Sequence, residues 1–93
     1  APGQLLNHYS PQKPLRLNVE EAKADEFLIG FGAIAGDLNL SQNGDLSEAA
    51  SQLFAFLHQA DANPTVIKIA VAPIPSTGIG QAINDRLTRA ALS

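Results

Sequence analysis

Cysteine is absent from this 93-residue chain. Neither a disulfide framework nor a thiolate metal site can therefore stabilise its fold. The two histidines, His8 and His58, lie far apart in the sequence, and without cysteine they predict no metal site. No apolar run is long enough to span a membrane and no signal peptide precedes the domain, so we expect a soluble, cytoplasmic protein without membrane contacts.

Basic residues are few as well: the chain has six Lys and Arg against nine Asp and Glu, and its net charge is −3. The six are scattered along the sequence, whereas nucleic-acid binding needs clustered cations that displace the counterions of the phosphates. The sequence therefore disfavours autonomous RNA binding. The length is that of one small domain with enough apolar residues for a core.

Hydrophobic patterning divides the chain into alternating strands and helices. Strands are predicted at residues 15–19, 27–32 and 65–75, and helices at residues 45–60 and 77–92. Residues 20–26 predict a polar, helix-prone connection, and a loop with a short strand at 38–40 follows the second strand. This alternation predicts an α/β fold, a single small domain with a mostly parallel sheet flanked by helices. A parallel crossover is expected between the strands at 27–32 and 65–75.

The helix predicted at residues 45–60 has the clearest signals. Asp45 followed by Glu48 forms a capping box, in which each side chain satisfies a free backbone amide at the helix start. The buried stripe of this helix is predicted to include Leu53, Phe54 and Leu57. For the second helix, Thr77 is the predicted N-cap. Its predicted buried face consists of Ile79, Ile83, Leu87 and Ala90.

The segment GFGAIAG places Gly30, Gly32 and Gly36 after a strand. The spacing G-x-G-x-x-x-G is one residue longer than the dinucleotide-binding fingerprint, and the loop runs on to Asp37 and Asn39 rather than into a helix that would receive a pyrophosphate. Tight turning and close strand packing are therefore the favoured interpretation of these glycines.

The segment PSTGIG follows a strand and opens the second predicted helix. Its backbone amides point outward at the positive end of a helix dipole, so Thr77, Gly78 and Gly80 are candidates for binding an anion or a nucleotide. The simpler alternative is an ordinary threonine cap with glycines that ease a tight turn. The segment lacks the Lys and Ser/Thr of a phosphate-binding loop.

The first 13 residues, which we call the linker, contain two prolines together with apolar side chains and the pair His8 and Tyr9. Nothing in the chain predicts a self-sufficient catalytic centre, because neither a G-x-S-x-G nor an H-E-x-x-H motif occurs. A lid that closes over another domain's active site is one interpretation of the linker, and a flexible connection is the other. The apolar residues favour the lid.

Three segments carry longer motifs. The linker matches the pattern S/A-P-G-M-x-x-x-H-Y-x-P at Ala1, Pro2, Gly3, His8, Tyr9 and Pro11. NLSQNGDLSEAASQLFAFL and IAVAPIPSTGIGQAINDRLTRAA match two further patterns, so nearly the whole chain is covered. Together the segments resemble the C-terminal domain and preceding linker of the two-domain L-threonylcarbamoyladenylate synthases, whose N-terminal half is a YrdC-like catalytic domain.

The resemblance implies a Rossmann-like accessory domain at 14–93 and an interdomain linker at 1–13. The full-length enzyme, a nucleotidyltransferase, uses ATP with a divalent metal, L-threonine and bicarbonate to make threonylcarbamoyl-AMP for the modification of tRNA. The implied lid residues are Pro2, Gly3, His8 and Tyr9. We expect no catalytic residue and no bound cofactor in this domain. Its expected partner is the catalytic domain of the same polypeptide, and its contact with tRNA is expected to be indirect.

Two residues depart from the family pattern: Gln4 stands where Met is usual, and Asn7 stands where many members have a basic residue. A direct phosphate contact from position 7 is therefore not expected. The alternative function is an autonomous nucleotide-binding or nucleotide-hydrolysing domain that uses the helix N-terminus at 77–80.

Overall fold

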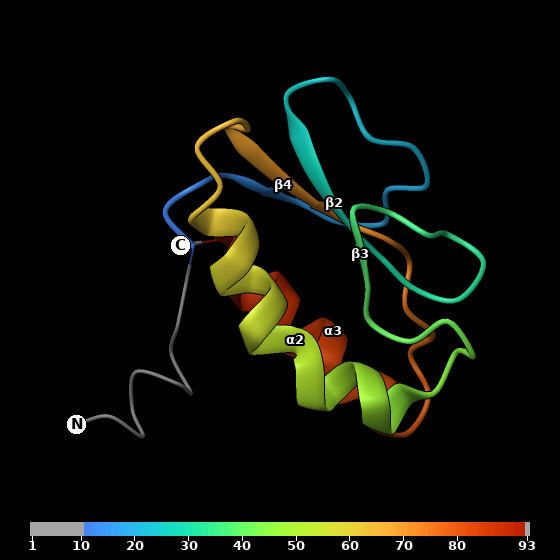
Figure 1. Ribbon diagram of the computed structural model, residues 1–93. Helices are drawn as coiled ribbons and strands as arrows, with labels where there is room; N and C mark the ends of the chain where they lie inside the picture. Colours follow the sequence, from blue (N-terminus) through green and yellow to red (C-terminus); the bar gives the residue numbers. More distant parts are fainter. Residues whose placement is uncertain (1–10, 93) are drawn as a thin grey trace.

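The computed structural model describes residues 11–92 of the chain (Figure 1). Its elements are β1 (Leu15–Arg16), β2 (Glu26–Gly30), β3 (Leu38–Asn39), α2 (Leu46–Asp61), β4 (Lys68–Val71) and α3 (Ile79–Leu92). The four strands form one sheet in the order β1-β4-β2-β3, and every neighbouring pair is parallel. The predicted α/β class, the parallel pairing of β2 with β4 and the short strand β3 are confirmed.

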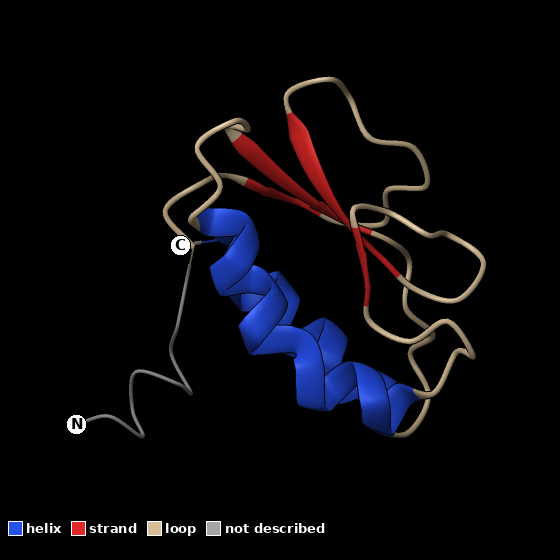
Figure 2. Cartoon of the chain, in the orientation of Figure 1, coloured by secondary structure: helices blue, strands red, loops and turns tan. Residues whose placement is uncertain are grey.

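Both helices cover the same face of the sheet (Figure 2). Side chains alternate along β2, so that Phe27 and Ile29 point to the helices and Leu28 points to the opposite face. α2 lies against β2 and β4, α3 packs on β1, and the two helices also touch each other. The largest fully buried apolar side chains of this layer are Ile29, Leu40, Leu57, Ile69, Val71 and Leu87.

The helix-free face is covered in part by the connection between β1 and β2. Val19 and Ala22 of this connection pack on Leu28 and on Ala70 of β4. The connection contains turns and bends but no helix, so the helix-prone prediction for residues 20–26 is wrong. The packing of Val19 and Ala22 on the sheet favours turns over the local helix propensity.

The start of α2 confirms one half of the predicted capping box. The Asp45 carboxylate accepts hydrogen bonds from the backbone amides of Ser47 and Glu48. The amide of Asp45 itself donates to the hydroxyl of Ser41 at 2.9 Å, and not to the Glu48 side chain. Ser41 is buried next to the helix start, so its short hydroxyl reaches this amide while Glu48 remains exposed.

Two predicted core residues lie farther out than expected. Phe54 is only half-buried, and the Arg86 guanidinium of α3 stacks over its ring at 5.1 Å from the centroid. Ile79 is 46% exposed because Gly80, the next residue, occupies the position where α3 approaches α2. The remaining predicted residues of that face, Ile83, Leu87 and Ala90, are buried.

The glycines of GFGAIAG allow the chain to cross closely over the end of β2. A Cβ atom on Gly30 would lie 2.0 Å from the carbonyl oxygen of Ile34, and one on Gly36 would lie 2.6 Å from the carbonyl oxygen of Leu28. Gly36 also has a φ of +64°. This crossing lets residues 31–37 connect two adjacent parallel strands, which ordinarily need a longer connection. The interpretation as close packing is confirmed.

Asn39 holds this crossing in place. Its side-chain amide donates to the carbonyl oxygens of Gly32 and Ile34, and its side-chain oxygen accepts from the amide of Ser41. One side chain thus links the glycine loop to the segment that starts α2.

Candidate functional site

The end of the linker is fastened to the C-terminal end of α2. The carboxylate of Asp61 accepts hydrogen bonds from the backbone amides of Gln12 and Lys13, at 3.2 Å and 3.0 Å. The Lys13 ammonium group also donates to the backbone carbonyl of Asp61. Pro11, the first described residue, is buried. The linker therefore meets the domain at a defined place.

The predicted lid residues Pro2, Gly3, His8 and Tyr9 lie outside the described residues. The last linker residues, 11–13, lead directly into β1, and the amide of Ile69 donates to the carbonyl oxygen of Pro14 at 2.9 Å. The linker thus enters at the edge of the sheet where β1 and β4 begin.

The second candidate group, Thr77, Gly78 and Gly80, lies at the N-terminal end of α3. Thr77 and Gly78 are exposed, and Gly80 is buried. The amides of Gly80 and Gln81 donate to the carbonyl oxygens of Thr77 and Gly78. A Cβ on Gly80 would lie 1.8 Å from the carbonyl oxygen of Pro75, so this glycine is required by close packing. Anion binding at this helix end stays a prediction.

The two candidate regions are not brought together. Gly80 lies beside Leu46 at the start of α2, while Gln12 and Lys13 are bound to Asp61 at its end. A helix of 16 residues is about 24 Å long, and this length separates the regions. His58, near the end of α2, is exposed.

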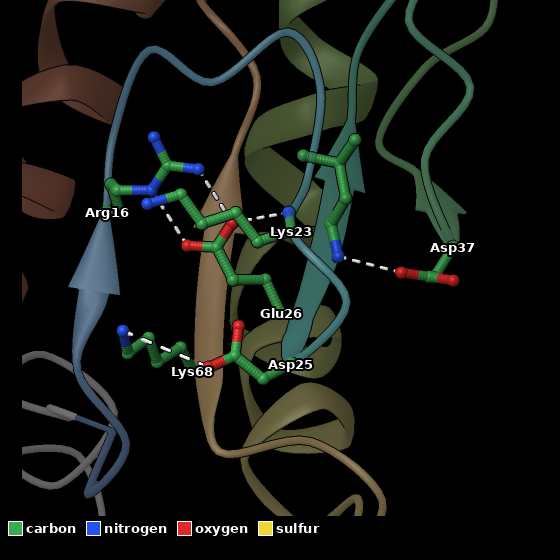
Figure 3. Close-up of polar contacts among 7 residues, drawn as sticks. Arg16, Lys23, Asp25, Glu26, Asp37 and Lys68 are labelled. Atoms are coloured by element: carbon green, nitrogen blue, oxygen red, sulfur yellow. Dashed lines mark hydrogen bonds and ion pairs between the residues drawn. The ribbon is translucent and has the colours of Figure 1, made fainter.

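A buried carboxylate on the helix-free face was not expected from the sequence (Figure 3). The side chain of Glu26 is 1% exposed and accepts two hydrogen bonds of 2.7 Å from the Arg16 guanidinium. The Lys23 backbone amide donates a third. Arg16, with help from Lys23, lowers the pKa of the Glu26 carboxyl to about 2 and outweighs the effect of burial. No sequence signal linked Arg16 of β1 with Glu26 of β2.

Glu26 and its partners form a polar cluster around the start of β2. Three hydrogen bonds engage the Glu26 carboxylate, and Lys68 pairs with Asp25 on the same side at 3.9 Å. Asp37 similarly accepts the backbone amide of Leu28 at 2.8 Å (Figure 3). These contacts stabilise the strand ends.

Cavities lie on both sides of α3. A shallow one of about 140 Å³ between α2 and α3 is lined by Ala50, Leu53, Ile79, Ala82, Ile83 and Arg86. A larger one of about 190 Å³ lies where β1 and β4 end, and polar side chains of α3 contribute to its wall. The second cavity was not predicted from the sequence, because its lining comes from three separate segments.

Residues 11–92 contain no group of three or more His, Asp or Glu side chains placed to hold a metal ion. Within the same range, neither helix has the length and apolarity needed to cross a membrane.

The motif residues mostly stabilise the fold. Asn39, Ser41 and Asp45 arrange the start of α2, and Asn84 donates to the carbonyl oxygen of Ile74 and to the Ser76 hydroxyl. Such motifs identify a fold family more than they identify a reaction.

Comparison with known proteins supports one family. The model of the threonylcarbamoyl-AMP synthase C-terminal domain matches residues 1–92, which includes the linker. No curated protein and no solved structure matches the chain significantly. The match spans almost the full length of the chain, so this chain belongs to the family of threonylcarbamoyl-AMP synthase C-terminal domains.

Proposed function

We propose that this domain is the accessory module of a threonylcarbamoyl-AMP synthase, and that its linker closes over the active site of a YrdC-like catalytic domain in the same polypeptide. The observation that carries the proposal is the attachment of the linker to Asp61. A lid needs one end held by a rigid body, and α2 supplies that body.

The attachment limits where the lid acts. His8 lies four residues before Gln12, so their Cα atoms are at most about 14 Å apart. The catalytic cleft that receives His8 and Tyr9 must then lie near the C-terminal end of α2. The opposite end of the helix layer, with Thr77 and Gly78, faces away from that cleft.

The proposed reaction benefits from a lid. Threonine and bicarbonate form a carbamate with loss of water, and a carbamate oxygen then attacks the α-phosphorus of ATP and displaces pyrophosphate. The product is a mixed anhydride that water hydrolyses. Closing the cleft excludes water, and the imidazole of His8 and the phenol of Tyr9 add hydrogen bonds at the closed site.

The full-length synthase tests the lid directly. We expect His8→Ala with Tyr9→Ala to lower the rate of threonylcarbamoyl-AMP formation by about tenfold or more. The matched control is Asp85→Ala, which removes an exposed helix residue that pairs with Arg89. A double variant with the kinetics of the unaltered enzyme would exclude the lid role.

The alternative, an autonomous nucleotide site at 77–80, has less support. The Gly80 and Gln81 amides are already engaged within the turn, and no basic residue occurs between Pro73 and Gln81. Calorimetry of the 93-residue chain with ATP, GTP and AMP distinguishes the two. Micromolar binding would favour the alternative, and no binding would favour the accessory role.

A further inference from the structure

The connections that follow the neighbouring strands β1 and β4 cross opposite faces of the sheet. After β1, residues 17–25 cross the helix-free face, where Val19 and Ala22 pack on the sheet. After β4, the chain crosses to the opposite face and forms α3, which packs on β1. In open α/β sheets, ligands bind in the crevice beyond the carboxyl ends of two such strands, where the connections leave in opposite directions.

The cavity of about 190 Å³ occupies this crevice. Its apolar lining comes from the ends of both strands and from α3: Leu17, Val71, Ile74 and Leu87. Its polar lining consists of Asn18, Ser76, Asn84 and Thr88. The cavity lies at the opposite edge of the sheet from the linker attachment at Asp61.

The hydrogen-bonding capacity of the cavity follows from Asn84. The carbonyl oxygen of Ile74 can only accept, so the Asn84 nitrogen must face it, at 2.8 Å, and the same nitrogen donates to the Ser76 hydroxyl at 2.9 Å. The side-chain oxygen of Asn84 is left as an acceptor. The Ser76 hydroxyl keeps its own proton for donation, so the cavity wall carries an acceptor next to a donor.

Asn18 contributes a second side-chain amide to the cavity, and its backbone has an unusual conformation. It is the only described residue other than glycine with a positive φ, at +58°. The left-handed conformation is unfavourable for most residues that have a Cβ atom, and asparagine tolerates it better than they do. At this position it places an uncommitted amide at the rim of the cavity.

The residues that line the cavity include no Lys, Arg, Asp or Glu. A ligand with a phosphate, or a zwitterion, would lose hydration there without gaining a charged partner. An apolar cavity of about 150 Å³ holds one benzene ring. A volume of about 190 Å³ fits a six-membered ring with one or two polar substituents.

We propose that the crevice at the ends of β1 and β4 binds a small neutral heterocycle of pyrimidine size. The edge of such a ligand presents a hydrogen-bond donor beside an acceptor, complementary to Asn84 and Ser76. Leu17 borders the cavity, and the buried Val71 and Leu87 line its base. Its lining includes none of residues 11–13 and none of residues 77–80.

Nuclear magnetic resonance of the 93-residue chain, which encloses a core of its own, tests the site. The probes are cytosine and nicotinamide, with L-threonine as a zwitterion that has a similar number of heavy atoms. We expect the two ring compounds to produce saturable shifts in the millimolar range at the amides of Asn18, Ser76, Asn84 and Thr88. We expect L-threonine to leave these amides unshifted.

Two substitutions remove polar groups without disturbing the core. Asn18→Gly relieves the strained φ, and Thr88→Val is isosteric at an exposed helix position. Each should weaken cytosine binding by about threefold to tenfold, the range for one hydrogen bond. The matched control Thr65→Val, on an exposed turn, should leave binding unchanged.

The proposal would be overturned if neither ring compound produced a saturable shift at these amides, or if L-threonine produced equal shifts. It would also be overturned if Asn18→Gly, Thr88→Val and the control Thr65→Val bound cytosine with equal affinity. Retained native spectra in both variants ensure that lost binding reports the site and not unfolding. Failure of this test would leave the lid proposal intact, since the lid depends on residues at the other edge of the sheet.

Discussion

The backbone amide of Lys13 donates a 3.0 Å hydrogen bond to the carboxylate of Asp61, the last residue of α2. The contact joins positions 48 residues apart in the sequence. It fixes the point at which the linker leaves the domain, because Gln12 binds the same carboxylate.

Removing this carboxylate should release the linker. In the full-length synthase, we expect Asp61→Ala to lower kcat about fivefold, because the lid loses its fixed end. Steady-state kinetics with Asp85→Ala as control measures the effect. Equal kcat values for the two variants would show that the attachment has no role in catalysis.

Two glycines of the same motif should differ in their tolerance of alanine. Gly30→Ala should lower the free energy of unfolding by about 3 kcal/mol or more, because its Cβ would collide with the Ile34 backbone. Gly32→Ala should cost only about 1 kcal/mol, since Gly32 has a φ of +61° but open space around it. Urea denaturation of both variants decides the matter; similar losses would contradict the close crossing.

Asn39 should be far more sensitive than a neighbouring asparagine. Asn39→Ala removes three hydrogen bonds that join the glycine loop to the start of α2, which we expect to cost about 2–3 kcal/mol. Asn43→Ala, at an exposed loop position, should change stability by less than about 0.5 kcal/mol. Thermal unfolding of the pair provides the comparison, and a tolerated Asn39→Ala would refute the role assigned to this side chain.

Glu26 should make the domain sensitive to acid. Its pKa is about 2 in the folded state against an ordinary value of 4.5, so folding is stabilised above pH 4.5. This contribution is lost as the pH falls from 4.5 towards 2, because the unfolded chain takes up the proton first. With Arg16 half-exposed and screened by solvent, we expect the contribution to be about 1–2 kcal/mol.

Urea denaturation across this pH range measures the effect. Glu26→Gln should lower stability at neutral pH and flatten the pH dependence below pH 4.5. The control Asp25→Asn removes an exposed contact to Lys68 and should change stability by less than about 0.5 kcal/mol. An unchanged pH profile in Glu26→Gln would contradict the depressed pKa.

Periodicity in the sequence was sufficient to predict the main elements. The apolar run of β2 and the stripe of α2 each reflect burial that repeats along the chain, so α2 and its Asp45 cap were predicted within a residue. The glycine spacing also predicted close packing. The helix-prone prediction for residues 20–26 was wrong, because contacts of Val19 and Ala22 with the sheet determine the conformation there.

The candidate sites depend on contacts between distant segments, which a single sequence does not encode locally. Asp61 ends an ordinary helix, and nothing near it predicts a bond to Lys13. Asn18 and Asn84 are separated by most of the chain, and only the strand order brings them to one cavity. The motifs around Asn39 and Asn84 could be recognised, but their structural roles became clear only with the fold.

Closure of the catalytic cleft by the linker should couple the use of ATP to the formation of product. In the full-length synthase, the ratio of pyrophosphate released to threonylcarbamoyl-AMP recovered should rise when His8 and Tyr9 are both replaced by alanine, because an open cleft admits water to the mixed anhydride. We expect about one pyrophosphate per threonylcarbamoyl-AMP in the unaltered enzyme and a clear excess of pyrophosphate in the double variant. Identical ratios and identical rates in the two enzymes would contradict it.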